Sequence, residues 1–145
     1  MILYGLNNIV KCGSEIYFID LVGERLHLRN ENSICLYGVT LDEIDRDLLE
    51  DIDMSDWVLD SLFKRHISFD NSEEFYYWGL GTGKYSIEKV DEDLYKLMIG
   101  SNILIYFETV RELQNAYHFY SDYDQEENEL TEDIDTKLKN LFKLI

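Results

Sequence analysis

Turns rich in glycine and asparagine divide the first forty residues into short apolar runs of four to nine residues. Runs of this length and spacing favour β-strands over helices. Because connections this short join neighbouring strands that run in opposite directions, the pattern predicts an antiparallel meander. The expected strands are residues 2–10, 15–22, 25–28 and 33–39. Proline is absent, so glycine, asparagine and aspartate must form the turns.

The period of the apolar residues changes at Thr40. Thr40 and Glu43 have the spacing of a capping box, and the apolar residues that follow recur at helical intervals. They predict a helix over residues 41–52, facing inward with Leu41, Ile44, Leu48 and Ile52. A second helix is expected from about Ser55 to a basic turn at 64–66, which would complement the helix C-terminus. Its expected inward residues are Trp57, Val58, Ser61 and Leu62.

The second half of the chain repeats this order of strands followed by helices. The expected strands are residues 74–79, 84–90, 94–99 and 103–108. Thr109 and Glu112 form another capping box, which opens a helix facing inward with Val110, Leu113, Tyr117 and Tyr120. A C-terminal helix is expected to carry Leu130, Ile134, Leu138, Leu141 and Ile145 on its apolar face.

These elements predict an α+β fold of antiparallel sheets, in which two four-strand meanders are each followed by helices. At 145 residues the chain is expected to form a single domain, with a pseudo-repeat over 1–66 and 73–145. This order of elements is similar to that of the Whirly fold. Four consecutive aromatics at 75–78 alternate between two sheet faces, and helices are expected to bury both sets.

The chain is strongly acidic, with 13 basic and 30 acidic residues and a net charge of −17. Hydrophobic residues make up 46% of it, which is too many for an intrinsically disordered chain. A field of this sign repels nucleic acid and anionic membranes and attracts basic proteins. Neither a signal peptide nor a membrane span is visible, so a cytoplasmic location is expected. In that compartment Cys12 and Cys35 are expected to be reduced, unless neighbouring strands bring them together.

Seventeen of the carboxylates fall in two stretches, nine within residues 42–60 and eight within residues 122–135, opposed only by Arg46. The first stretch is expected to lie mostly on the outer faces of helices. The second follows a cluster of tyrosines, and exposed tyrosine among carboxylates is typical of protein interfaces that receive lysine and arginine. The expected partner-binding residues are Tyr120, Asp122, Tyr123, Asp124, Glu126, Glu127, Glu129, Asp47, Asp51 and Asp53.

No motif of catalysis or cofactor binding withstands inspection. The glycine-rich segment 79–84 lacks the first glycine of a phosphate loop and the hydroxyl residue after its lysine, so a hairpin connection is expected. Acidic residues from Asp122 and from Asp51 follow the first spacings of an EF-hand but lack its glycine and its final glutamate. The three histidines are scattered along the sequence. We therefore assign no catalytic residue, no metal ligand and no cofactor, and expect a protein that is not an enzyme.

In size, charge and general style the whole chain resembles the immunity proteins of bacterial contact-dependent growth-inhibition systems. The resemblance implies that the protein binds and neutralises a cognate toxin domain. Such domains are often basic nucleases, and among nucleases an RNase is favoured. Carboxylates would pair with the lysines and arginines that such a nuclease uses to hold phosphates, and tyrosines would anchor the contact. The alternative is a phage or plasmid protein that mimics nucleic acid and inhibits a DNA-binding protein.

Overall fold

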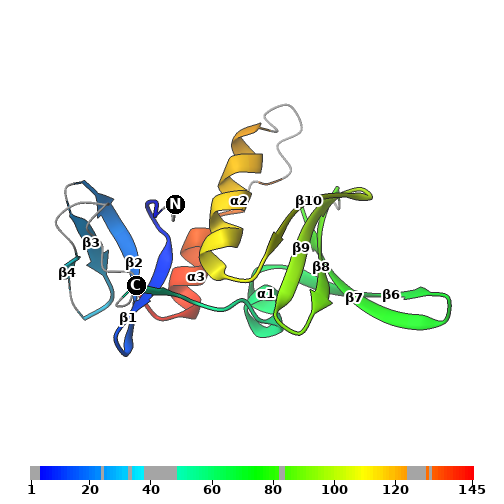
Figure 1. Cartoon of the computed structure of the whole chain (residues 1–145), viewed down its shortest axis with the longest axis horizontal. Coiled ribbons are helices and arrows are strands. Elements are labelled where there is room, and N and C mark those ends of the chain that lie inside the picture. The colour runs from blue at the N-terminus through cyan, green and yellow to red at the C-terminus, as the bar shows by residue number, and fades with distance from the viewer. Residues whose placement is uncertain are drawn as a thin grey trace. The chain divides into compact units, whose positions relative to one another are not determined.

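The computed structural model describes residues 4–23, 25–32, 34–37, 49–81, 84–123, 130 and 132–145 (Figure 1). Side chains are described for these residues except 34–37 and 123. The fold is α+β with antiparallel sheets, as the sequence predicts. The chain divides into two compact units, one comprising residues 1–52 and 134–145 and the other residues 53–133. These boundaries differ from those of the expected pseudo-repeat, because residues 53–66 fall in the second unit and the last helix falls in the first.

The sheet of the first unit has five strands in the order β4-β3-β2-β1-β5. The bounds are β1 Ile9–Cys12, β2 Glu15–Val22, β3 Leu26–Arg29, β4 Ile34–Tyr37 and β5 Leu49–Asp51. The first four form the predicted meander, with β1 beginning later than expected. The fifth returns to the other side of β1, where Lys11 pairs with Glu50.

Strand β5 contradicts the end of the helix predicted over 41–52. The start of that predicted helix, with its Thr40–Glu43 capping box, lies outside the described residues. Residues 49–51 are extended, and Leu49 is buried in the apolar cluster of this sheet. Pairing with β1 satisfies the backbone of these residues, and this tertiary contact overrides the helical spacing of Leu48 and Ile52. Five further residues of the cluster come from the meander: Val10, Tyr17, Ile19, Leu26 and Leu28.

Helix α3, Ile134–Leu141, completes the first unit. Ile134 and Leu138 are buried as expected, whereas Leu130 and Ile145 lie outside the helix. The ammonium of Lys139 lies 4.2 Å from the centroid of the Phe18 ring and donates a 2.6 Å hydrogen bond to Asn7 Oδ1, which fixes α3 on β2.

The strand order also decides the question of the cysteines. Cys12 lies on β1 and Cys35 on β4, and two strands separate them. Three strand spacings amount to about 14 Å. A disulfide requires Cα atoms within about 7 Å, so the fold excludes a bond between these two residues.

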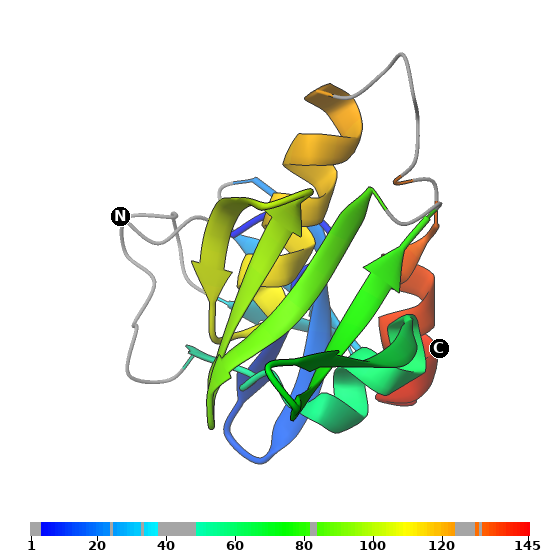
Figure 2. The ribbon, with the colours of Figure 1, turned by 90° about the vertical axis from the view of Figure 1, so that its right-hand side faces the viewer.

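The sheet of the second unit also has five strands, in the order β10-β9-β8-β7-β6 (Figure 2). The bounds are β6 Lys64–Asp70, β7 Glu73–Leu80, β8 Tyr85–Asp91, β9 Leu94–Ile99 and β10 Asn102–Phe107. Four of them are the predicted strands, and β7 and β8 form the hairpin expected around segment 79–84. Residues 64–66, at the start of β6, were expected to form a basic turn after a helix. Instead β6 pairs with β7 along its whole length, from Lys64 opposite Gly79 to Asp70 opposite Glu73.

Helices α1, Asp56–Leu62, and α2, Val110–Tyr123, belong to the second unit. Helix α1 begins near Ser55 as predicted, and Ser55 caps it by accepting a hydrogen bond from the backbone N–H of Val58. Val58, Leu59 and Leu62 are buried, whereas the prediction that Trp57 and Ser61 face inward was wrong, since both are exposed. On α2, Thr109 and Glu112 form the predicted capping box. Its inward residues Val110, Leu113 and Tyr117 are buried and Tyr120 is half-buried.

Candidate protein-binding surface

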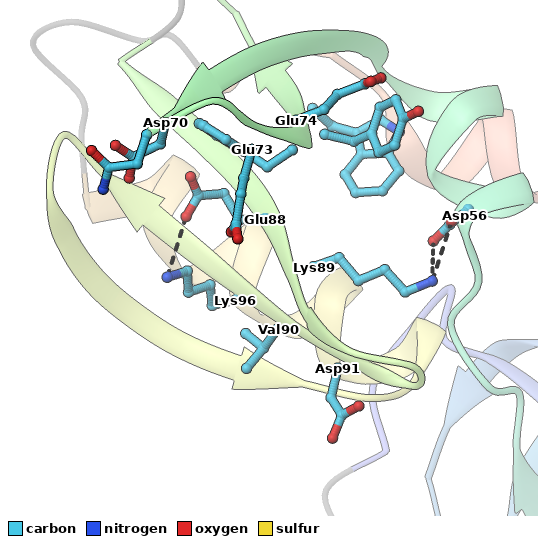
Figure 3. Close-up of a pocket in the computed structure, with 13 residues that line it drawn as sticks. Asp56, Asp70, Glu73, Glu74, Glu88, Lys89, Val90, Asp91 and Lys96 are labelled. Atoms are coloured by element: carbon cyan, nitrogen blue, oxygen red, sulfur yellow. Dashed lines mark hydrogen bonds and ion pairs between the residues drawn. The ribbon is translucent and has the colours of Figure 1, made fainter.

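Two hairpins of the second sheet diverge from each other and leave a notch between them. Strand β7 starts at Glu73, but it pairs with β8 only over residues 77–80. Beyond the pair Tyr77–Glu88, the β6–β7 and β8–β9 hairpins continue as separate two-stranded ribbons. The space between them, which we call the acidic notch, has a volume of about 750 Å³ (Figure 3). It is large enough to receive side chains of a partner protein.

Carboxylates dominate the walls of the acidic notch. Six line it, against two lysines, which leaves a local charge of −4: Asp56, Asp70, Glu73, Glu74, Glu88 and Asp91. Both lysines are already paired within the unit, Lys96 with Glu88 at 3.2 Å and Lys89 with Asp56 at 3.3 Å. In Figure 3 the Glu73 side chain reaches from the β6–β7 ribbon toward the β8–β9 ribbon. The notch therefore has unneutralised negative charge to offer a basic group.

Large apolar side chains stand beside this charge. Strand alternation and the cross-strand pair Ile67–Tyr76 place Ile67, Phe69 and Tyr76 on one face of the β6–β7 ribbon. We call these three residues the ribbon strip. They are 56%, 71% and 42% exposed, respectively, so helices do not bury the aromatic run as expected. Among the four consecutive aromatics only Trp78 is fully buried. Exposed apolar residues surrounded by carboxylates have the composition of a surface that binds basic proteins.

Asp56, which lines the notch, links α1 to strands β8 and β9. It accepts a 2.6 Å hydrogen bond from the Tyr95 hydroxyl in addition to its contact with Lys89. Burial alone would raise the pKa of Asp56, but these two hydrogen bonds and the charges of Lys89 and Arg65 outweigh it and lower the pKa. Burial, together with the bond to Asp56, raises the pKa of Tyr95 far above its ordinary value. Asp56 is therefore ionised at neutral pH and Tyr95 is protonated.

Asp60, one helical turn after Asp56, links α1 to strands β6 and β7. It accepts two hydrogen bonds from the Arg65 guanidinium, at 2.8 and 2.7 Å, and one from the indole N–H of buried Trp78 at 2.9 Å. The guanidinium also lies 5.3 Å from the Tyr76 ring centroid. The hydrogen bond to Asp60 raises the pKa of Arg65. Two carboxylates of the acidic stretch 42–60 thus serve the internal structure of the second unit.

The residues predicted to bind a partner lie elsewhere in the chain. Asp51 is half-buried on β5 in the first unit. In the second unit Asp53 is exposed beside its bridge to Thr109, and Asp122 is exposed near the end of α2, which finishes at Tyr123. Half-buried Tyr120 is on the same helix. Outside the described residues are Asp47, Asp124, Glu126, Glu127 and Glu129. None of the described ones lines the acidic notch.

One local sequence feature of the notch was not recognised in the sequence analysis, namely the turn residues Asn71 and Ser72 between acidic neighbours. Asn71 and Ser72 both have positive φ angles, 49° and 69°, and form the two-residue turn between β6 and β7. Such a turn joins strands in a tight hairpin. The segment Asp70–Glu74 therefore identifies an acidic hairpin tip, but its divergence from the β8–β9 hairpin is a long-range feature.

Among the described residues, no group of histidine, cysteine, aspartate and glutamate side chains is arranged to hold a metal ion. In the same part of the chain, no helix has the length and apolar character needed to cross a membrane. Comparisons with protein-family models, with curated proteins and with solved structures gave no match.

Proposed function

We propose that this protein binds and neutralises a basic protein domain, in the manner of a cytoplasmic immunity protein acting on a cognate toxin nuclease. The observation that carries the proposal is the acidic notch, whose local charge of −4 stands beside the exposed ribbon strip. Lysines and arginines of the partner would enter the notch, and the apolar strip would be buried by the same contact. The net charge of −17 would speed their encounter.

Occlusion is the mechanism that this surface supports. A nuclease holds its phosphate substrate with basic residues. Carboxylates that pair with those residues remove the charge that the substrate requires, and no reaction by the inhibitor is needed. Rim charges mainly set the association rate, whereas the apolar strip and the pairs within the notch would set the dissociation rate.

The test is co-expression with basic toxin domains one at a time, among them any that is encoded beside this protein, to find one that it neutralises. We expect this protein to protect cells against that domain and to leave unrelated toxin domains active. If it instead inhibits unrelated DNA-binding proteins, with an effect that salt weakens, the protein is a nucleic-acid mimic and the immunity proposal fails.

The acidic stretch 122–135, which begins in the last turn of α2, remains a predicted alternative interface. The variant Asp122→Lys with Asp124→Lys tests it on the same complex, because Asp122 is exposed and its replacement should leave the fold intact. Weaker binding by this variant, with unchanged binding by variants of the notch, would move the interface to that segment.

A further inference from the structure

Strand β6 has opposite charges at its two ends. It begins with Lys64 and Arg65 and ends with Asp70. On the neighbouring strand β7, Glu73 is paired with Asp70 and Glu74 with Phe69, so more negative charge lies beside the acidic end. The β6–β7 ribbon is therefore positively charged where β6 begins and negatively charged at the turn where β6 ends.

No described strand of the second unit pairs with the outer side of β6. In the second unit β6 forms one edge of the sheet, with β7 as its neighbour among the described strands. Its seven residues pair with β7 without a register shift, so the strand is regular. Lys64 and Asp70 are exposed, and neither makes a side-chain hydrogen bond or ion pair with another described residue. A regular, exposed edge strand with apolar residues is a template for another strand.

The opposite edge of the same sheet lacks these properties. Strand β10 contains a register shift between Ile103 and Ile105, a feature that hinders pairing along an edge. It also contains no charged residue. Nothing on β10 would therefore select a register or a partner.

We propose that β6 pairs with β6 of a second copy of this chain, in antiparallel orientation, about a two-fold axis at Ile67. A two-fold axis perpendicular to a continuous sheet keeps equivalent faces of the two copies on the same side of the sheet. Such an axis passes midway between two directly opposite residues, so one residue must pair with its own copy. Centring the axis on Ile67 pairs all seven residues. The facing residues are then Lys64 with Asp70, Arg65 with Phe69, His66 with Ser68, and Ile67 with Ile67.

This register brings each basic end against an acidic end. Lys64 of one copy faces Asp70 of the other, and the two-fold axis makes this contact twice. Arg65, which already lies over aromatic rings, gains the exposed Phe69 ring of the second copy as a further cation–π partner. The net charge of −17 on each copy opposes association. At about 0.15 M salt the Debye length is about 8 Å, so distant repulsion is screened while contacts between facing residues persist.

Charge exchange tests the proposal in sedimentation equilibrium of the full chain at this ionic strength. Wild-type protein should show a monomer–dimer equilibrium. Lys64→Asp alone and Asp70→Lys alone each place like charges opposite one another twice, and each should weaken the dimer by roughly tenfold. The double variant restores opposite charges and should return the dimer to wild-type strength. Glu92→Lys, in the exposed β8–β9 turn, matches the charge change of Asp70→Lys and should leave the dimer unweakened.

Cross-linking at the axis gives a second measurement that does not depend on charge. In the proposed dimer Ile67→Cys faces its own copy, so mild oxidation should form a covalent dimer that reductant releases. Ile103→Cys, on the other edge and also exposed, is the control and should cross-link no faster than wild type. A monomeric wild-type protein at every concentration, or single and double charge variants with equal effects, would overturn the proposal. So would equal cross-linking at the two positions.

Discussion

Replacing Asp60 by alanine tests whether the acidic residues of α1 hold the second unit together. The Asp60 carboxylate accepts a hydrogen bond from the indole of Trp78, whose side chain is fully buried. It also accepts two hydrogen bonds from Arg65. Alanine removes all three acceptor contacts at once and leaves the indole N–H without a partner from α1.

The two kinds of contact differ in weight. A buried donor that loses its partner costs about 1–3 kcal/mol. The ion pair contributes less, about 0–1 kcal/mol, because the side chains of Arg65 and Asp60 are 34% and 44% exposed. We therefore expect Asp60→Ala to lower the free energy of unfolding by about 2 kcal/mol. Asp60→Asn keeps an oxygen for the indole and loses only the charge, so it should cost less than about 1 kcal/mol.

Urea unfolding at pH 7, followed by far-UV circular dichroism, measures both variants. Glu92→Ala, which removes an exposed carboxylate from the β8–β9 turn, controls for the change in net charge. Equal costs for alanine and asparagine would refute the role of the indole hydrogen bond. A cost for Asp60→Ala as small as that for Glu92→Ala would refute the structural role of Asp60 altogether.

Two further predictions concern Tyr95 and the cysteines. Tyr95→Phe should cost about 1–2 kcal/mol at pH 7. Since the folded-state pKa of Asp56 is lowered, this cost should shrink as acid unfolding experiments pass below about pH 4. Because the folded-state pKa of Tyr95 is raised, wild type should lose stability above about pH 10 faster than Tyr95→Phe does. If the free energy of unfolding depends on pH equally in the two proteins, in acid and in alkali, the pKa directions of both Asp56 and Tyr95 are contradicted. Reductant should leave the melting temperature unchanged, because β2 and β3 separate Cys12 from Cys35; a fall would contradict the strand order.

Local signals predicted most of the strands correctly. The runs that end at turns with glycine or adjacent acidic residues, such as β2 and β9, have the expected bounds. Likewise the capping box at Thr109 begins α2 as expected. In each case the determining residues are neighbours in sequence, so the pattern contains the information needed.

Long-range pairing explains the failures. Residues 49–51 have helical apolar spacing around them, but they pair with β1 nearly forty residues earlier. At β6, the charges of 64–66 imitate a helix C-terminus, whereas the alternation of Arg65, Ile67 and Phe69 belongs to a strand paired with β7. The acidic notch depends on where β7 and β8 stop pairing, and no short segment records that point. The predicted partner-binding residues that the structure describes do not line the acidic notch, and which surface binds a partner stays a prediction.

The most direct test of the acidic notch as the binding site measures the affinity of the toxin domain that this protein neutralises for two matched charge variants. Glu73→Lys with Glu74→Lys reverses two carboxylates that line the acidic notch, at the tip of the β6–β7 hairpin. Glu92→Lys with Asp93→Lys makes the same change in net charge at the exposed tip of the β8–β9 hairpin, outside the residues lining the notch. We predict that the first variant weakens binding by roughly tenfold or more, and that the second weakens it severalfold less. Equal losses would mean that only net charge matters, and an unchanged affinity in the first variant would contradict the notch as the binding site.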